Sequence, residues 1–285
     1  MRPLTIMTWN VRYFSHMWRG ARSSTGNLRR AAQAIVASGL QPDVIALQEI
    51  EDTSLRGGLG DVRQLDRFRS ALHHALYQTG CDDRYQGHYV PVHRYAVGAA
   101  ALYTTGLAFL VREGLRVGAL GSQEITHFRI PLFAPLKQRR AVSWLAVEGV
   151  TIFNTHLSLP AFFEGGPHTV PTRMGTASNQ RCEVEHLLSA IGERSGVLVG
   201  DFNSQRDSLI YGQIQQAGWE DACPEVPGGA TARFMRWRMH IDHIFVRGVS
   251  CDARRGFGIE EDSVFLGLSD HSPKWIRLTG SPGPA

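Results

Sequence analysis

The chain has 285 residues, and its 43% hydrophobic content is sufficient to bury a core between two β-sheets. The formal net charge of +4 and pI near 9.0 permit an anionic partner, but an ordinary solvated surface explains this mild basicity equally well. The four cysteines lie far apart without a Cys-x-x-Cys pair, which indicates neither a zinc site nor a disulfide framework. No repeat or Pro/Gly/Ser-rich linker divides the chain, so we expect one domain over residues 1–279 and a disordered tail at 280–285.

The N-terminus enters a predicted strand at Leu4, which leaves no room for a cleavable signal peptide. The longest weakly apolar stretch, residues 96–111, is interrupted by Tyr103-Thr104-Thr105-Gly106 and is too short and too polar to span a bilayer. We therefore expect a cytoplasmic protein without stable membrane association. The sequence does not indicate an oligomeric state, and a monomer is the default expectation.

In the N-terminal part of the chain, the hydrophobic pattern predicts strands that alternate with helices. A strand over Leu4–Asn10 is followed by a helix that Asn27 caps and Gly39 ends. The apolar run 44–47 forms a second strand, which ends just before Glu49. Apolar residues at helical spacing then place a second helix within residues 61–79.

In the rest of the chain, short apolar runs predict strands with short connections, for which antiparallel pairing is the natural outcome. The expected strands cover residues 98–102, 107–112, 115–117, 141–147, 150–156, 196–199, 241–247 and 273–278. Two further helices are expected over residues 176–194 and 207–217. Strand runs with two helical blocks in each half predict an α/β fold of two sheets packed face to face with helices outside.

Six short polar clusters, each at or just beyond the end of an apolar run, form the most informative pattern in the sequence. They are Trp9-Asn10, Gln48-Glu49, Asn154-Thr155-His156, Gly200-Asp201-Phe202-Asn203, Ile241-Asp242-His243 and Ser269-Asp270-His271. A buried strand that ends in such residues carries them to the rim of a sheet, where open α/β folds place their chemistry. No Ser or Cys nucleophile motif accompanies them. Hard oxygen ligands with histidine suit a Mg²⁺-type ion and attack of water on a phosphate ester.

Taken singly, the first clusters also have plainer explanations. Asn10 is typical of a turn after a strand, and a lone histidine such as His156 is usually structural. Glu49 is more informative, because a carboxylate that leaves a buried strand needs a cation or hydrogen-bond donors to offset its desolvation.

The clusters of the C-terminal half carry more geometric information. Gly200 lets the backbone turn, and Asp201 and Asn203 face the same side if the segment is extended, although Asx turns explain the pair equally well. Asp242 lies inside a predicted strand, where a lone carboxylate is expected to orient a buried imidazole or a ligand. Adjacent strand residues point to opposite faces, so Ser269-Asp270-His271 must form a turn if its acid and its histidine serve one site.

Together the six clusters, in this order, resemble the motifs of the endonuclease/exonuclease/phosphatase superfamily over residues 4–278. The central Asn154-Thr155-His156-Leu157 segment is more similar to the deoxyribonuclease I, sphingomyelinase and tyrosyl-DNA phosphodiesterase branches than to the abasic endonucleases. The resemblance implies a four-layered α/β sandwich of two mostly antiparallel β-sheets packed face to face with helices outside. It also implies hydrolysis of a phosphoester with Mg²⁺, or with Mn²⁺ or Ca²⁺ in its place.

The resemblance further implies a role for each matching position. It makes Glu49 the principal metal ligand with Asn10 near it and Asp270 completing the shell, and it assigns catalysis to His156, Asp201, Asn203, Asp242 and His271. Of the catalytic group, Asp201 and Asn203 orient water and phosphate, His271 with Asp242 is the base or phosphate-binding imidazole, and His156 is the acid that assists the leaving group. Arg12 stands where abasic endonucleases carry an acid, which weakens the case for a second metal.

The substrate class depends on the loops. Candidate substrate-binding residues are Arg12, Arg139, Arg140, Arg236 and Trp237. Arginines interleaved with aromatic residues suit a phosphate backbone and stacked bases, so we expect a phosphodiesterase or nuclease, although surface arginines with partly buried rings are the plainer alternative. The apolar segment 157–171 keeps a lipid or inositol-phosphate phosphoesterase as an alternative, and a phosphate-binding module without catalysis as a lesser one.

Overall fold

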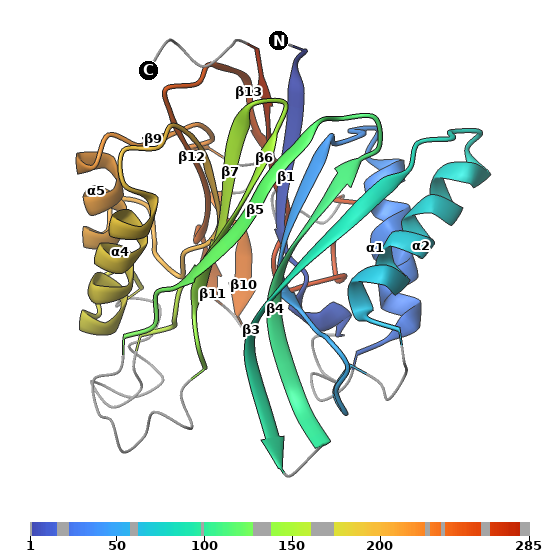
Figure 1. Cartoon of the computed structure of the whole chain (residues 1–285), viewed down its shortest axis with the longest axis horizontal. Helices are drawn as coiled ribbons and strands as arrows, with labels where there is room; N and C mark the ends of the chain where they lie inside the picture. Colours follow the sequence, from blue (N-terminus) through green and yellow to red (C-terminus); the bar gives the residue numbers. More distant parts are fainter. Residues whose placement is uncertain are drawn as a thin grey trace.

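Two six-stranded β-sheets form the centre of the protein, with helices on the outer side of each sheet (Figure 1). This architecture comes from a computed structural model that describes residues 2–15, 23–57, 62–97, 100–127, 138–160, 174–225, 229–234, 237–257 and 263–279. The predicted four-layered α/β sandwich is confirmed, with the layers in the order helices, sheet, sheet, helices.

The first sheet has the strand order β13-β14-β1-β2-β4-β3. Its strands are β1 (Leu4–Asn10), β2 (Val44–Ile50), β3 (Tyr85–Val97), β4 (Ala100–Arg112), β13 (Cys251–Gly256) and β14 (Lys274–Leu278). Only β1 and β2 pair in parallel within this sheet, and the other pairs are antiparallel. The parallel pair carries the ends of both strands, and therefore two of the polar clusters, to the same edge.

The second sheet has the order β5-β6-β7-β8-β12-β9. Its strands are β5 (Val117–Glu124), β6 (Ala141–Val147), β7 (Val150–His156), β8 (Gly196–Asp201), β9 (Glu220–Asp221) and β12 (Asp242–Arg247). Here β7 and β8 are the one parallel pair. A separate hairpin joins β10 (Ala232–Phe234) to β11 (Trp237–Met239).

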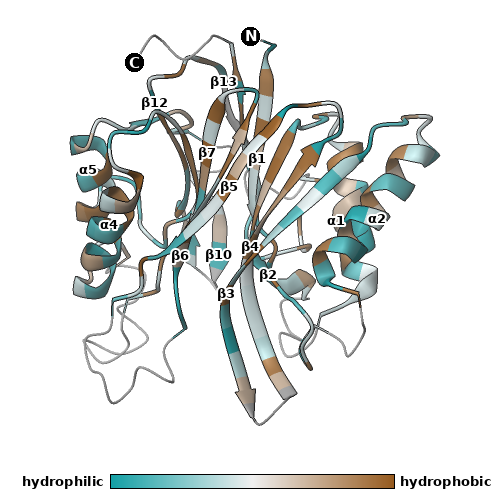
Figure 2. Cartoon of the chain, in the orientation of Figure 1, coloured by the Kyte–Doolittle hydropathy of each residue, from teal (hydrophilic) through white to brown (hydrophobic). Residues whose placement is uncertain are grey.

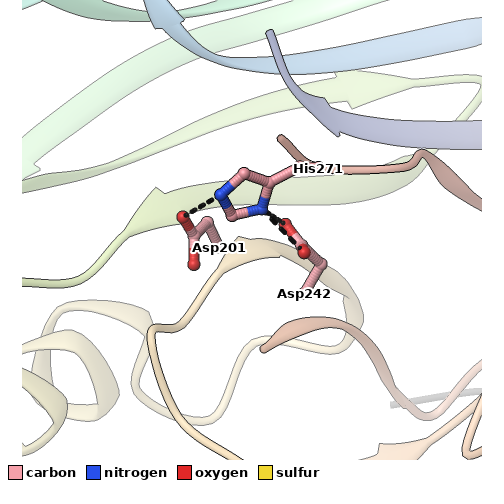
Figure 3. Close-up of side chains that lie close together, drawn as sticks. All are labelled: Asp201, Asp242 and His271. Atoms are coloured by element: carbon pink, nitrogen blue, oxygen red, sulfur yellow. Dashed lines mark hydrogen bonds and ion pairs between the residues drawn. The ribbon is translucent and has the colours of Figure 1, made fainter. Parts of the chain in front are cut away.

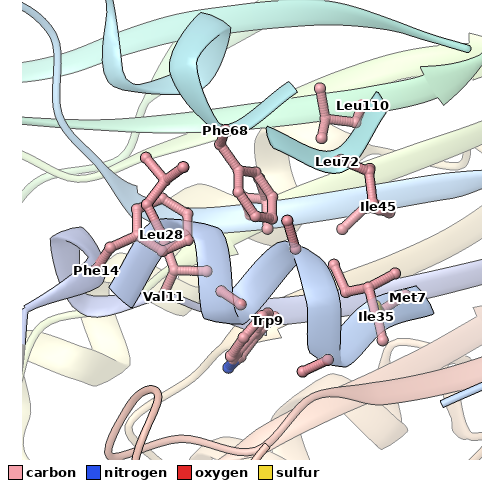
Figure 4. Close-up of a cluster of buried hydrophobic side chains, with 14 of the residues drawn as sticks. Met7, Trp9, Val11, Phe14, Leu28, Ile35, Ile45, Phe68, Leu72 and Leu110 are labelled. Atoms are coloured by element: carbon pink, nitrogen blue, oxygen red, sulfur yellow. The ribbon is translucent and has the colours of Figure 1, made fainter. Parts of the chain in front are cut away.

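The four α-helices in the described part of the chain pack on the sheets in pairs. Helices α1 (Thr25–Ala37) and α2 (Gln64–Gln78) pack on the first sheet, and α4 (Ser178–Ile191) and α5 (Leu209–Gln216) pack on the second. Figure 4 shows the apolar layer under α1 and α2, where Leu28 and Phe68 meet side chains of β1 and β2. A further apolar cluster fills the space between the sheets, which is why the central strands are strongly hydrophobic (Figure 2).

Two features of the first half differ from the sequence-based prediction. Asn27 does not cap α1; Ser24 does, by accepting a hydrogen bond of 3.3 Å from the backbone N–H of Asn27. The Asn27 side chain is buried and donates to the carbonyl of Leu268 at 2.8 Å, so it ties the helix to a distant loop. Residues 100–102 and 107–112, which were expected to form two strands, belong to one long strand, β4, and its partner β3 was not predicted. The first two residues of the strand expected at 98–102 lie outside the described residues.

No helix in the described part of the chain has the length and apolar character needed to cross a membrane. The tail predicted at 280–285 lies outside the described residues.

Candidate active site

The two parallel strand pairs, one in each sheet, bring four of the predicted site residues together. Asn10 ends β1, Glu49 lies near the end of β2, and His156 and Asp201 are partners at the ends of β7 and β8. The Nδ2 of Asn10 donates to Oε1 of Glu49 at 3.3 Å and to Oδ2 of Asp201 at 3.0 Å, across the gap between the sheets. The Nε2 of His156 lies 3.4 Å from the same Asp201 oxygen and 3.8 Å from Glu49.

Gly200 is required for close approach of two strands and not for the turn that the sequence predicted. It stays within β8, opposite Thr155 of β7, with a φ of +146°. A Cβ at this position would lie 2.0 Å from the carbonyl oxygen of Thr155, so any larger residue would push β7 and β8 apart. The glycine therefore holds His156 and Asp201 side by side.

Asn203 reaches the site through an Asx turn, the alternative that the sequence left open. Its backbone N–H donates to Oδ1 of Asp201 at 2.9 Å, and its own φ is +46°, so the segment is not extended. Its Nδ2 lies 3.3 Å from Nε2 of His156 and donates to the carbonyl of Leu157 at 2.9 Å. Asp201, Asn203 and His156 thus form one buried group of polar side chains.

His271 lies between two carboxylates (Figure 3). Its Nδ1 is 2.9 Å from Oδ2 and 3.1 Å from Oδ1 of Asp242, and its Nε2 is 3.7 Å from Oδ2 of Asp201. Asp242 begins β12 directly opposite Asp201 of β8, which explains why both acids reach one imidazole. Burial alone would lower the pKa of His271, but the charges of Asp242 and Asp201 outweigh it and hold this pKa well above its ordinary value.

The pKa values of Asp201 and His156 are shifted in opposite directions. Burial raises the pKa of Asp201 to about 7, with the charge of Asp242 adding to the rise and His271 opposing it. Burial also lowers the pKa of His156 well below its ordinary value, assisted by the positive charges of Arg140 and His271. At neutral pH the site therefore contains a cationic His271, a neutral His156 and an aspartate close to its midpoint.

A β-bulge turns Glu49 toward the other sheet. The pairing of β2 with β4 shifts between Gln48 and Ile50, and Glu49 has a φ of +57°, which side chains other than glycine rarely adopt. Gln48 and Glu49 both face β7 as a result, with Gln48 contacting Asn154 and Glu49 approaching His156. One position of backbone strain thus coincides with the residue that the sequence predicted to hold a metal.

The surroundings of Glu49 fit a cation. Its Oε2 is buried and has no hydrogen-bond partner among the described residues, and an isolated carboxylate oxygen in such a place needs a positive charge. The other two predicted ligands are already engaged: Asn10 presents its amide nitrogen to Glu49, and Asp270 pairs with Arg12 at 2.8 Å. One carboxylate supplemented by water and phosphate oxygens is a common way to hold Mg²⁺.

Asp201, Asp242 and His271 also place ligand-type atoms within 4.8 Å of one another. This trio is a poorer metal site than Glu49, because a protonated His271 donates hydrogen bonds and offers no lone pair.

A left-handed turn after β1 supplies a part of the site that the sequence did not reveal. Arg12, Tyr13 and Phe14 have φ values of +42°, +53° and +53°, a conformation that costs about 1–3 kcal/mol per residue. The turn directs Arg12 to Asp270, and it places the Tyr13 hydroxyl against Glu49. Burial raises the pKa of Tyr13 above its ordinary value, with the charge of Glu49 adding to it, so the hydroxyl keeps its proton and acts as a donor.

The predicted substrate-binding residues lie in different surroundings. Arg139 and Arg140 line a small cavity together with Glu49 and His156; the Arg139 side chain is 59% exposed, whereas Arg140 is buried and donates to Ser158 at 3.3 Å. Arg12 is at the rim, in its ion pair with Asp270. Trp237 is half-buried on β11, in the hairpin whose Ala232 bridges His271. Arg236 lies outside the described residues.

Part of the apolar segment 157–171, which suggested lipid contact, also lies outside the described residues. At its start, Leu157 is fully buried in the apolar cluster beneath α4 and α5, so it packs in the core and does not face a substrate.

Comparisons with known proteins agree with this fold. The chain aligns over 97–100% of its length with solved structures, although no curated protein sequence gives a significant match. An endonuclease/exonuclease/phosphatase from Beutenbergia cavernae has a TM-score of 0.67 and 20% identity, covering 100% of this chain and 74% of that one. The human Nocturnin catalytic domain with bound sulfate has a TM-score of 0.59 and 17% identity, covering 98% of this chain and 95% of that one.

A third similar structure is ANGEL2, described as a 2′,3′-cyclic phosphatase, with a TM-score of 0.59, 15% identity and coverage of 97% of this chain and 95% of that one. At these identities the structural likeness establishes the fold. The sequence itself matches the profile of one family from residue 7 to residue 271, a range that contains every predicted metal-binding and catalytic residue. The chain belongs to the Endonuclease/Exonuclease/phosphatase family.

Proposed function

We propose that this protein is a divalent-metal-dependent phosphodiesterase that hydrolyses nucleic acid by in-line attack of water. The observation that carries the proposal is the position of Asp201, which lies 3.7 Å from the cationic His271 on one side and 3.4 Å from the neutral His156 on the other. A carboxylate placed between one protonated and one neutral imidazole can hold the attacking water, while the protonated imidazole offers a fixed positive charge to a phosphate oxygen.

Each polar residue of the cluster has a distinct task in this proposal. Asp201, with a pKa of about 7, accepts a proton from water near neutral pH. His271, held in orientation and in its charged form by Asp242, donates from Nε2 to a phosphate oxygen. Asn203 keeps His156 in place through its amide nitrogen. His156 takes a proton from solvent once the bound anionic diester offsets the desolvation of the imidazolium, and it gives this proton to the leaving oxygen as the ester bond breaks.

Glu49 would hold the metal ion, with Tyr13 donating to that carboxylate and Asn10 linking it to Asp201. A bound divalent cation would offset the negative charge that accumulates on the phosphate oxygens. The Arg12–Asp270 ion pair lies on the same rim and is positioned to meet the substrate beside the metal. A magnesium ion is the first choice because the available ligands are oxygens.

Two observations support nucleic acid as the substrate. Arg12 and Arg139 bring exposed or partly exposed guanidinium groups to the rim beside the buried catalytic group, as a polyanionic strand requires. A similar structure, ANGEL2, is described as a 2′,3′-cyclic phosphatase, and a phosphate that joins neighbouring 2′ and 3′ hydroxyls is a ribose phosphate.

The test is hydrolysis by the purified protein with and without Mg²⁺. Bis(p-nitrophenyl) phosphate and the mono-ester measure the chemistry, and single-stranded DNA, duplex DNA, RNA, sphingomyelin and inositol phosphates measure the substrate class. We expect Mg²⁺-dependent cleavage of the diester and of at least one nucleic acid, lost in His271→Ala and retained in His74→Ala, a change of an exposed histidine on α2.

Cleavage confined to sphingomyelin or inositol phosphates would replace the nucleic-acid proposal with a lipid or inositol-phosphate one. Absence of turnover with Mg²⁺, Mn²⁺ and Ca²⁺ would leave only a phosphate-binding module.

A further inference from the structure

The long β3–β4 hairpin projects past its own sheet at the end where the catalytic residues lie (Figure 1). Strand β2 pairs with β4 only as far as Gly106, whereas β3 and β4 stay paired through Val97 and Ala100. The outer part is thus a two-stranded ribbon, supported along one edge by backbone hydrogen bonds from Leu55 and Arg56. A two-stranded ribbon has little hydrophobic core, so it cannot bury large aromatic rings. Such rings are therefore available to contact a ligand.

This ribbon carries a cluster of aromatic rings. Tyr95 and Tyr103 are directly opposite each other on the two strands, and their rings stack with centroids 5.4 Å apart and planes 17° apart. His93 lies 5.6 Å from Tyr103. Both tyrosines are only half-buried, and neither belongs to the apolar clusters formed by the described residues. They therefore present ring surface to solvent.

A stacked column connects these rings to the metal-binding side of the site. The guanidinium of Arg56 lies 4.7 Å from the centre of the Tyr103 ring and 3.5 Å from the centre of the Tyr13 ring. The hydroxyl of Tyr13 contacts Glu49. Such cation–π contacts fix the orientation of Tyr103 relative to Glu49, the predicted metal ligand, even though the hairpin extends away from the core.

The ribbon also adjoins the positively charged wall of the small cavity beside Glu49. The backbone N–H of Arg139 donates to Nδ1 of His93 at 3.4 Å, and Gln138 donates to Thr105 at 2.8 Å. Arg139 lines that cavity together with His156, and its exposed side chain makes a 3.4 Å surface pair with Glu124. Aromatic rings and a guanidinium thus lie next to each other within reach of one extended ligand.

We propose that Tyr95 and Tyr103 form a stacking platform for the unpaired bases of a single-stranded nucleic acid whose phosphate enters the active site. The proposal rests on the proposed function and narrows its substrate class. Aromatic rings next to basic side chains bind single strands by stacking and charge, and the bases of a duplex do not expose their faces for such contact. A stacking platform on this ribbon would position the nucleic-acid strand, while the buried residues around Asp201 carry out the hydrolysis.

The test is binding of fluorescently labelled thymidine and uridine oligomers by the full chain in EDTA, where hydrolysis does not interfere. We expect Tyr95→Ala and Tyr95→Leu to weaken binding about 5- to 100-fold, the range for loss of one stacking ring, and Tyr95→Trp to retain it. The two oligomers distinguish DNA from RNA. Tyr77→Ala, which removes a tyrosine 68% exposed on α2, is the matched control and should bind as the wild type does.

An abasic oligomer with the same phosphates separates stacking from a structural role of the tyrosine pair, because cross-strand aromatic contacts also stabilise hairpins. Wild type and Tyr95→Ala should bind it equally. A loss of the same size on the abasic oligomer, full affinity in Tyr95→Leu, or preference for duplex would each overturn the proposal. Since binding is measured without metal, a wild type that stacks single strands but never hydrolyses an ester would overturn only the proposed function.

Discussion

The Nε2 of Gln48 donates a hydrogen bond of 2.7 Å to Oδ1 of Asn154, and this contact joins the two sheets directly behind the catalytic rim. Both side chains are fully buried. Gln48 also donates to Thr8, and the Asn154 amide donates to the carbonyl of Leu47. Gln48 adjoins Glu49, and Asn154 lies on the same face of β7 as His156, so the contact sets the spacing between metal-binding and catalytic residues.

Replacing both partners of this pair should destabilise the protein by less than the sum of the two single replacements. Gln48→Leu and Asn154→Leu each leave a buried amide without its partner, so each is expected to lower the free energy of unfolding by about 1–3 kcal/mol. The double variant should lose less than the sum, which a double-mutant cycle by urea denaturation measures. Gln78→Leu, an exposed change at the end of α2, is the control. Strict additivity would mean that the hydrogen bond between Gln48 and Asn154 adds no coupling energy between the sheets.

Asp242 is expected to set the alkaline limit of activity through His271. The pKa of His271 is held well above its ordinary value against burial by the charges of Asp242 and Asp201, and the protonated form donates to phosphate. Activity is therefore present below this pKa and lost as pH rises through it. In Asp242→Asn the pKa of His271 should fall, so the alkaline limb of the pH–activity profile should move to lower pH. The value of kcat/KM should drop about 100-fold or more near neutrality.

The measurement is the pH dependence of bis(p-nitrophenyl) phosphate hydrolysis, with titration of the His271 imidazole followed by NMR. Asp66→Asn, a change of an exposed carboxylate on α2, should leave the profile unchanged. An alkaline limb at the wild-type position in Asp242→Asn would show that His271 does not act as the cationic donor.

Glu49→Gln should separate stability from metal binding. Because Oε2 of Glu49 is buried without a partner, replacing the charge with a neutral amide is expected to raise the free energy of unfolding in EDTA by about 1 kcal/mol. The wild type should gain thermal stability when Mg²⁺ is added, and the variant should not. Thermal melting with and without Mg²⁺ measures both effects, and an equal gain in the two proteins would place the ion elsewhere.

The strands that carry the site could be predicted because burial leaves a direct mark on sequence. A strand covered on both faces must be apolar, so the polar residues that end β1, β2, β7 and β8 stand out in the sequence. The Asx turn at Asn203, which the sequence offered as an alternative to an extended segment, follows from the ordinary turn preference of aspartate. Strand β3 could not be found in this way. Its outer part has no core beneath it, and its mixture of tyrosine, histidine and arginine forms no apolar run.

The left-handed turn at Arg12, Tyr13 and Phe14 was equally hidden, for a different reason. Asn10 indicates a turn and accepts a hydrogen bond from the backbone N–H of Arg12, but no glycine, asparagine or aspartate occupies the three positions with positive φ. Those φ values are accompanied by contacts with Asp270 and Glu49, which are distant in sequence. Asn27 shows the opposite error, because a residue that favours a helix cap is used for a buried tertiary hydrogen bond. The roles assigned to the individual site residues, and the single-domain boundary, stay predictions.

Gly200 provides a test of the geometry that brings His156 and Asp201 together. An alanine Cβ would lie 2.0 Å from the carbonyl oxygen of Thr155, and the φ of +146° is unfavourable for any L side chain. Gly200→Ala should therefore lower the free energy of unfolding by about 3 kcal/mol or more and separate β7 from β8, so that activity falls even in the folded fraction. Gly212→Ala is the matched control, since this glycine lies in α5 with no atom within 4 Å of the added methyl, and alanine favours helix by about 1 kcal/mol. The denaturant concentration at the midpoint of unfolding should thus fall for Gly200→Ala and rise for Gly212→Ala, although both variants replace glycine with alanine. Equal stability of the two variants would show that β7 and β8 do not need this close approach.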